Sequence, residues 1–213
     1  MKQTTLNIFE ELFIRYPALK SSRENILNAF CTIKKAYENG GTLYCCGNGG
    51  SSSDSEHIVG ELLKTFKKRR NIDEQTSKKL KDFGEDGEFL LNNLEGSLPA
   101  VSLTSQTATL TAFANDKSWE VTFAQQLYGL GKTGDCLFVI STSGNSKNCV
   151  YATLIAKTKG INTIVLTGES GGRLSKLCDV CICVPEKETY KVQELHLPVY
   201  HCLCSMLEEE LFD

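Results

Sequence analysis

The sequence predicts an α/β fold in which helices cover both faces of one parallel sheet. Short apolar segments alternate with segments of helical periodicity from residue 42 to the end of the chain. The apolar segments carry hydrophobic residues at consecutive positions, which is typical of strands that are buried on both faces. Strands separated by helices favour parallel connections. We therefore expect a doubly wound sheet in a three-layer arrangement, preceded by N-terminal helices.

Residues 1–40 are predicted to form a helical segment of two helices. The first has its apolar residues at helical spacing and ends at Pro17. The second begins with a capping box formed by Ser21 and Glu24 and ends at Gly40. These helices precede the alternation of strands, so they either serve as assembly elements or cover one face of the sheet.

The alternating elements follow in order. Each strand is a short apolar run, and each helix begins after a loop rich in Gly or Ser or ends at a glycine. Strands are expected at 42–46, 100–104, 136–141, 162–167 and 180–184. Helices are expected from about Ser53, between the second and third strands, at 148–159, and from about Thr189 to the C-terminal end.

The chain of 213 residues is predicted to be a single domain, 1–213. Its composition, 41% hydrophobic and 23% charged, is sufficient for a packed core. Residues 67–97 differ from the rest because they are charged, weakly periodic and interrupted by Gly and Asn. We interpret this stretch as a charged excursion that is solvated or acts as a lid.

Charge and hydropathy exclude several kinds of partner. The formal net charge is −3, and the only strong cationic run, residues 67–70, is too short for a nucleic-acid-binding face. No apolar run approaches the roughly 20 residues of a membrane span. The N-terminus has no apolar signal core, which favours a cytoplasmic protein with reduced thiols. The ten cysteines are interpreted as small core residues, with redox sensing or adventitious metal binding as the alternative.

Two Ser/Gly turns are the strongest indication of a ligand. One comprises residues 47–54 and the other residues 141–146, and each joins an apolar strand to a helix. Glycines, hydroxyls and helix N-terminal amides in such turns suit a phosphate or a sugar. Neither turn matches a nucleotide-binding motif, so we expect a sugar phosphate. Loop and cap residues without a ligand are the alternative interpretation.

Two pairs of polar residues lie at helical spacing. His57 and Glu61 are four residues apart and therefore share a helix face, where they either bind a divalent metal, act as an acid/base pair or form a surface hydrogen bond. Gln193 and His201 share a broad face of the C-terminal helix, with Pro198 between them expected to bend it. His196 points away from His201, which indicates packing or a hydrogen bond behind the site.

At these positions the chain resembles the sugar isomerase (SIS) domain family and, more narrowly, the phosphoheptose isomerases. The matching stretches cover nearly the whole chain except residues 67–97, which are longer than the usual connection of the family. They are 47–51, 56–62, Asn115 with Asp116, 140–146, 166–168 with Gly171 and Gly172, 192–196, and His201. The resemblance implies a SIS-type fold, which is flavodoxin-like or Rossmann-like.

The resemblance also implies a substrate, a metal and an assembly. Phosphoheptose isomerases convert sedoheptulose 7-phosphate to D-glycero-D-manno-heptose 7-phosphate, and they form homotetramers with active sites between subunits. Carried over to this sequence, the phosphate would bind Ser141, Thr142, Ser143 and Ser146. The rest of the sugar would contact Asn48, Gly49, Gly50, Ser51, Glu61, Asn115, Asp116 and Gln193. One Zn²⁺ per subunit would bind His57, Glu61, Gln193 and His201.

The implied catalytic residues are Glu61 and His201. Isomerisation through an enediol requires a base at carbon and a group that handles the oxygen protons, and we assign these roles to Glu61 and His201, respectively. Two alternatives stay open. One is a non-catalytic SIS-fold regulator that binds the replication initiator DnaA, and the other is an isomerase of a different sugar phosphate.

Overall fold

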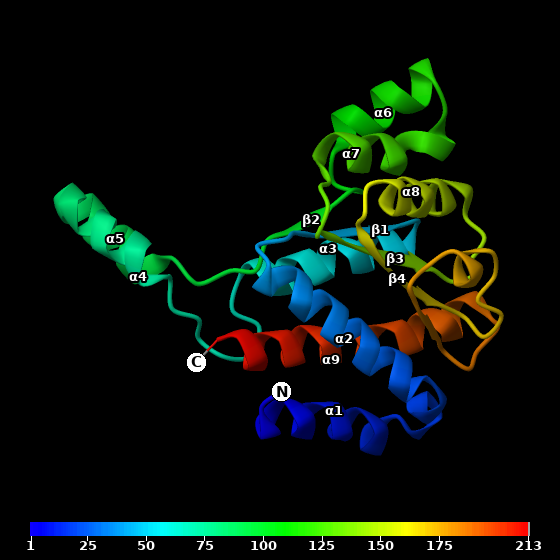
Figure 1. The fold of residues 1–213 in the computed structure, drawn as a ribbon, viewed down its shortest axis with the longest axis horizontal. Coiled ribbons are helices and arrows are strands. Elements are labelled where there is room, and N and C mark those ends of the chain that lie inside the picture. The colour runs from blue at the N-terminus through cyan, green and yellow to red at the C-terminus, as the bar shows by residue number, and fades with distance from the viewer. Residues whose placement is uncertain (213) are drawn as a thin grey trace.

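A computed structural model describes residues 1–212 and consists of three layers around one sheet (Figure 1). The sheet has five strands, all parallel, in the order β2-β1-β3-β4-β5. The strands are β1 (Leu43–Gly47), β2 (Ala100–Ser102), β3 (Cys136–Ser141), β4 (Asn162–Thr167) and β5 (Val180–Cys183). The predicted α/β class is confirmed. Asp213, the last residue of the predicted domain, lies outside the described residues.

The point where the strand order reverses lies between β1 and β3. The chain passes from β1 outward to β2 and then returns to place β3 on the other side of β1. The carboxyl ends of two such neighbouring strands leave a crevice, which is where open α/β sheets bind their ligands. Every residue of β1 and β3 is buried, which explains their continuous apolar runs. The two Ser/Gly turns follow these two strands.

Two hydrophobic clusters attach the helices to the faces of the sheet. One cluster joins α2 (Arg23–Glu38), α3 (Gly50–Leu63) and α9 (Thr189–Leu211) to one face (Figure 1). The other joins α6 (Thr107–Asp116), α7 (Thr122–Leu130) and α8 (Lys147–Thr158) to the opposite face. Helix α1 (Gln3–Arg15) packs on α9.

The predicted capping box is absent from α2. The preceding residues, Pro17–Ser22, form a 3₁₀ helix, and no side chain caps the first turn of α2. The Ser22 hydroxyl instead donates to the carbonyl oxygen of Cys183 on β5. Helix α2 contributes Phe30 and Ile33 to the core, so it covers the sheet.

The charged excursion contains helices that its weak periodicity did not predict. We call residues 71–95 the arm; it contains α4 (Glu74–Leu80), a 3₁₀ turn and α5 (Gly84–Asn93). The arm extends away from the three layers (Figure 1). Helix α4 buries none of its residues, and Phe83 and Phe89 are 68% and 67% exposed.

Helix α9 runs without a break through Pro198. None of the helices in residues 1–212 combines the length and hydropathy that a membrane crossing requires.

The cysteines divide into two groups. Six are buried, namely Cys45, Cys46, Cys136, Cys149, Cys202 and Cys204, as expected of core residues. Among the others, Cys181 and Cys183 on β5 are half-buried, and their Sγ atoms are 3.5 Å apart. The contact with Cys181 lowers the pKa of Cys183 to about 7.

Candidate functional site

The two Ser/Gly turns lie side by side and are joined by a pair of amides. The amide nitrogen of Asn48 donates to the side-chain oxygen of Asn148 over 2.9 Å, and Asn148 donates back to Asn48 over 2.8 Å. Asn148 is 3% exposed and lies at the start of α8. Asn148 follows the Ser/Gly residues and has no distinguishing spacing, so it could not be predicted as a site residue from the sequence.

The first turn brings the backbone close to other groups. Gly49 has φ +57°, which favours glycine. A side chain at Gly50 would collide with the amide of Gln193 from α9. Gln193 therefore lies against the start of α3, next to Asn48, Gly49 and Ser51. This position suits its predicted contact with the sugar.

The second turn places two hydroxyls together directly before the start of a helix. The hydroxyl of Ser141 donates to that of Ser146 over 3.2 Å, and α8 begins immediately afterwards at Lys147. The backbone of Gly144 is in close contact with that of Gly171, so the 168–175 loop supports the turn from behind. A helix N-terminus preceded by hydroxyls is a favourable site for an anion. Thr142 and Ser143 lie in the same turn.

Near the first turn is a small cavity of about 80 Å³. Besides residues of the turn it is lined by Thr104, Trp119 and Phe123. Thr104 follows β2, Trp119 begins the 3₁₀ helix before α7, and Phe123 is in the first turn of α7. Sequence reasoning missed them because they belong to no motif. Asn115 and Asp116 are exposed at the end of α6, where the Asn115 amide donates to Asp116 over 2.9 Å.

His57, Glu61 and His201 form a second cluster, as their predicted roles require. The Nε2 atom of His57 is 3.1 Å from Oε1 of Glu61, and the ring centroids of His57 and His201 are 5.0 Å apart. The Oε2 atom of Glu61 and the Nε2 atom of His201 are buried without a hydrogen-bond partner. His201 also lines a cavity of about 260 Å³ between α1 and α9.

Burial controls the charge of His201. Desolvation lowers its pKa, His57 lowers it further, and Glu61 opposes the shift. The imidazole of His201 is therefore neutral at pH 7 and able to accept a proton.

The predicted metal ligands are only partly assembled. No three His, Cys, Asp or Glu side chains within residues 1–212 are already arranged to hold a metal ion. The chemistry of the set nevertheless fits, because two imidazoles and a carboxylate lie together and two of their polar atoms make no hydrogen bond. The fourth predicted ligand, Gln193, lies about two helical turns away, against Gly50.

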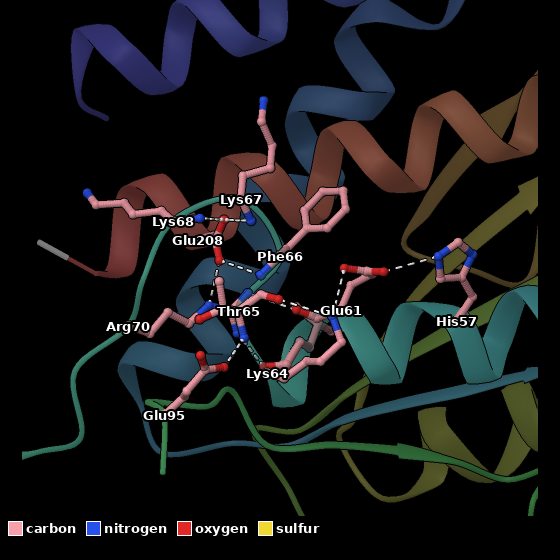
Figure 2. A network of polar contacts seen from close by, with 11 residues as sticks. His57, Glu61, Lys64, Thr65, Phe66, Lys67, Lys68, Arg70, Glu95 and Glu208 are labelled. Carbon is pink, nitrogen blue, oxygen red and sulfur yellow. Dashed lines mark hydrogen bonds and ion pairs between the residues drawn. The ribbon is translucent and has the colours of Figure 1, made fainter. Parts of the chain in front are cut away.

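A buried ion pair holds the end of α3 that carries Glu61 (Figure 2). Arg70 and Glu208 are 1% and 2% exposed, and Nε of Arg70 donates to Glu208 over 2.7 Å. The other two Arg70 nitrogens donate to the backbone oxygens of Leu62 and Glu61 over 2.7 and 2.8 Å. The last carbonyl groups of a helix lack partners within it, and Arg70 supplies partners here.

Glu208 organises the loop that leads from α3 to the arm. Its carboxylate accepts hydrogen bonds from the backbone nitrogens of Phe66, Lys67 and Lys68 over 2.8 to 3.1 Å. Every polar atom of this ion pair is thereby matched to a partner, as buried charges require. The pair connects α3, the root of the arm and α9 (Figure 2).

The two parts of the candidate site are separated along α3. The Ser/Gly turns lie near Gly50 at its start, whereas His57 and Glu61 follow by seven and eleven residues. At 1.5 Å per residue this separation is about 10 to 16 Å along the helix axis.

Comparisons with known proteins identify the family and the fold. The SIS domain family model matches residues 100–206. The phosphoheptose isomerase of a Nitratiruptor species is 39% identical over 187 residues, which are 88% of this chain and 87% of the relative. That of Aneurinibacillus thermoaerophilus is 35% identical over 210 residues, covering 99% and 91%. The structure of phosphoheptose isomerase GmhA from Neisseria gonorrhoeae superposes with TM-score 0.74 at 30% identity, covering 94% of this chain and 95% of that chain.

Proposed function

Because the chain belongs to the SIS domain family, in its phosphoheptose isomerase branch, we propose that it converts sedoheptulose 7-phosphate to D-glycero-D-manno-heptose 7-phosphate. The observation that carries this proposal is the cluster of His57, Glu61 and His201 on the same molecule as two ligand-binding turns. The relatives named above are phosphoheptose isomerases. An aldose–ketose isomerase needs both parts: a phosphate anchor and an acid/base pair.

The substrate phosphate is assigned to the second turn. Ser141, Thr142, Ser143 and Ser146 supply hydroxyls, and the N-terminus of α8 supplies backbone amides. The rest of the sugar is assigned to Asn48, Gly49, Gly50, Ser51, Asn115, Asp116 and Gln193. With a net charge of −3, the protein attracts an anion through these local dipoles and not through its overall charge.

Proton transfer is assigned to Glu61 and His201. Glu61 removes the proton from one of the two carbons that exchange oxidation state and returns it to the other. His201, neutral at pH 7, handles the proton on the oxygen. Neither Oε2 of Glu61 nor Nε2 of His201 has a hydrogen-bond partner, and the ammonium of Lys64 is 4.0 Å from Oε2 of Glu61. Both atoms are therefore free to accept a hydrogen bond in these roles.

A single Zn²⁺ per subunit is assigned to His57, Glu61, Gln193 and His201. When bound, the ion would polarise the substrate carbonyl and stabilise the negative charge that develops on its oxygen. Two imidazole nitrogens with carboxylate and amide oxygens are a suitable ligand set for zinc.

The proposed assembly is a homotetramer with active sites between subunits. In one subunit the phosphate-binding turn and the Glu61 cluster are separated along α3. A second copy that placed its own Glu61 cluster beside these turns would complete a site. Cysteines that are all free support the proposed cytoplasmic location.

The proposed function is tested by incubation with sedoheptulose 7-phosphate, with and without a chelator. We expect product from the native protein, and about 10² to 10⁴-fold lower kcat for Glu61→Gln and His201→Ala. Glu24→Gln, which removes an exposed carboxylate on α2, is the control. Lack of product together with tight binding to DnaA would instead support the regulator, and turnover of another sugar phosphate would support the second alternative.

A further inference from the structure

A chain of hydrogen bonds links His57 to a carboxylate behind it. The hydroxyl of Tyr200 donates to Oδ1 of Asp54 over 3.2 Å, and this hydroxyl oxygen of Tyr200 is 3.1 Å from Nδ1 of His57. On the other side of the imidazole, Nε2 of His57 is 3.1 Å from Oε1 of Glu61. Tyr200 lies on α9 and the other three side chains lie on α3, so the hydrogen bonds cross the contact between these helices.

The donor and acceptor roles follow from the number of protons. Tyr200 has one hydroxyl proton, and the carboxylate of Asp54, whose Oδ1 is 3.2 Å away, can only accept it. Toward His57 the Tyr200 oxygen can therefore only accept, which requires the proton of a neutral His57 to be on Nδ1. Nε2 then presents a lone pair to Glu61 Oε1, which is also an acceptor. Two acceptors 3.1 Å apart are repulsive unless a cation or a proton lies between them.

The position of Tyr200 is fixed by packing. It is 1% exposed, and its ring meets those of His57 and His201 edge-on, with centroid distances of 5.6 and 4.9 Å. A side chain enclosed in this way cannot turn its hydroxyl elsewhere without losing buried contacts. Residues behind a metal ligand commonly fix its tautomer and orientation.

We propose that Tyr200 and Asp54 are positioning residues that hold His57 as the Nδ1-protonated tautomer and present its Nε2 lone pair beside Glu61 to a divalent cation. Neither residue is among the predicted ligands or catalytic groups. The inference deepens the proposed function, because it specifies which nitrogen of His57 binds the metal. The tautomer itself does not depend on whether the protein is an isomerase.

The first experiment is ¹⁵N NMR of the histidine rings in the full-length, metal-free protein at neutral pH. We expect Nδ1 of His57 to carry a proton in the native protein. In Tyr200→Phe, which removes only the hydroxyl, we expect Nδ1 to lose this proton and the ring to be protonated on Nε2, where it can bond to Glu61. A native His57 protonated on Nε2 alone would overturn the proposal, and so would a Tyr200→Phe variant that keeps the proton on Nδ1.

The second experiment measures zinc affinity by competition with a chromophoric chelator. We expect Tyr200→Phe to bind zinc about 10- to 100-fold more weakly than the native protein. Tyr37→Phe is the matched control, because Tyr37 has a buried hydroxyl without a hydrogen-bond partner. Equal zinc affinity in the two variants would overturn the proposal. If the native protein bound no zinc, the proposed set of zinc ligands would be wrong. The NMR spectra would still show whether Tyr200 and Asp54 fix the tautomer of His57.

Discussion

His196 shows how much the surroundings change the chemistry of one residue type. It is fully buried, and burial lowers its pKa to about 4. His201 lies on the same helix but contacts His57 and lines a cavity. The expected role of His196 in packing agrees with its complete burial, and the difference follows from which face of α9 each residue occupies.

His196 makes the stability of the protein depend on pH. Its pKa is about 4 when folded and about 6.5 when unfolded. Protons bind more strongly to the unfolded chain, so this contribution is complete above pH 6.5 and is lost as the pH falls toward 4. From pH 7.5 to 5 we expect the free energy of unfolding to fall by about 2 kcal/mol because of His196.

Urea unfolding at the two pH values measures this effect. The variant His196→Leu has no titratable group at the position, so its stability should depend on pH less than that of the native protein by this amount. Equal pH dependence of the two proteins would show that His196 is not neutral in the folded state.

At the scale of elements, the C-terminal end of α3 depends on a partner distant in the sequence. Arg70 and Glu208 are 138 residues apart in the sequence. Their ion pair forms only when the segment before the arm, which contains Arg70, packs against α9. Arg70→Met would leave the Glu208 carboxylate buried without a cation, which costs about 3–5 kcal/mol.

Chemical denaturation compares Arg70→Met with Arg69→Met. Arg69 is the exposed neighbour, so its replacement should change the stability by no more than about 0.5 kcal/mol. Similar losses in the two variants would contradict the structural importance of the buried pair.

The arm is expected to contribute little to the stability of the body. Gly96 is packed against the carbonyl oxygen of Asn71, so the two ends of the arm meet, and α4 buries none of its residues. Replacing residues 73–94 by two glycines should change the free energy of unfolding by less than about 1 kcal/mol. Loss of the cooperative unfolding transition would show instead that the arm is part of the core.

Elements that repeat one physical pattern could be predicted from the sequence. The strands β3 and β4 were predicted at their observed bounds. Each is a short, continuous apolar run between two loops, which is a pattern typical of a buried strand. Helix α3 begins three residues before its predicted start at Ser53, because the glycine-rich turn itself enters the helix. The predicted capping box of Ser21 and Glu24 was wrong because Ser21 lies inside the 3₁₀ helix Pro17–Ser22. Helix α2 therefore begins at Arg23, and Ser22 precedes it in place of Ser21.

Candidate site residues could be predicted where they belong to a sequence motif. They could not be predicted where only the three-dimensional fold brings them to the site. His57 and Glu61 were suggested by their spacing and His201 by resemblance, and the structure brings the three together. In the sequence, Arg70 cannot be distinguished from its exposed neighbour Arg69. The two differ only because Arg70 pairs with Glu208, which is distant in the sequence. Trp119 lines the cavity beside the first turn because the fold brings distant segments together. Spacing along the sequence does not reveal this contact.

At the scale of the whole molecule, the proposed sharing of active sites has a direct test. One variant, Ser143→Asp, places a negative charge in the phosphate-binding turn, and the other, Glu61→Gln, lacks the base. If sites form between subunits, mixed oligomers contain some sites with neither change. Two inactive variants should therefore regain part of the native activity after they are unfolded and refolded together.

The control is each variant unfolded and refolded alone, which should stay inactive. The native mass, measured by light scattering, should be about four times the 23.5 kDa of one chain. Mixed oligomers without any recovery would show that each subunit carries its own complete site.

The amide pair between Asn48 and Asn148 also affects the thermodynamics of binding. It joins the two turns before any substrate arrives, so the conformational entropy of both loops is already lost when the chain folds. A ligand that then contacts both turns does not have to order them, and more of its contact energy remains as affinity. For a ligand bound at the two turns as proposed, the buried strands beneath them thus contribute to recognition through the rigidity that they impose.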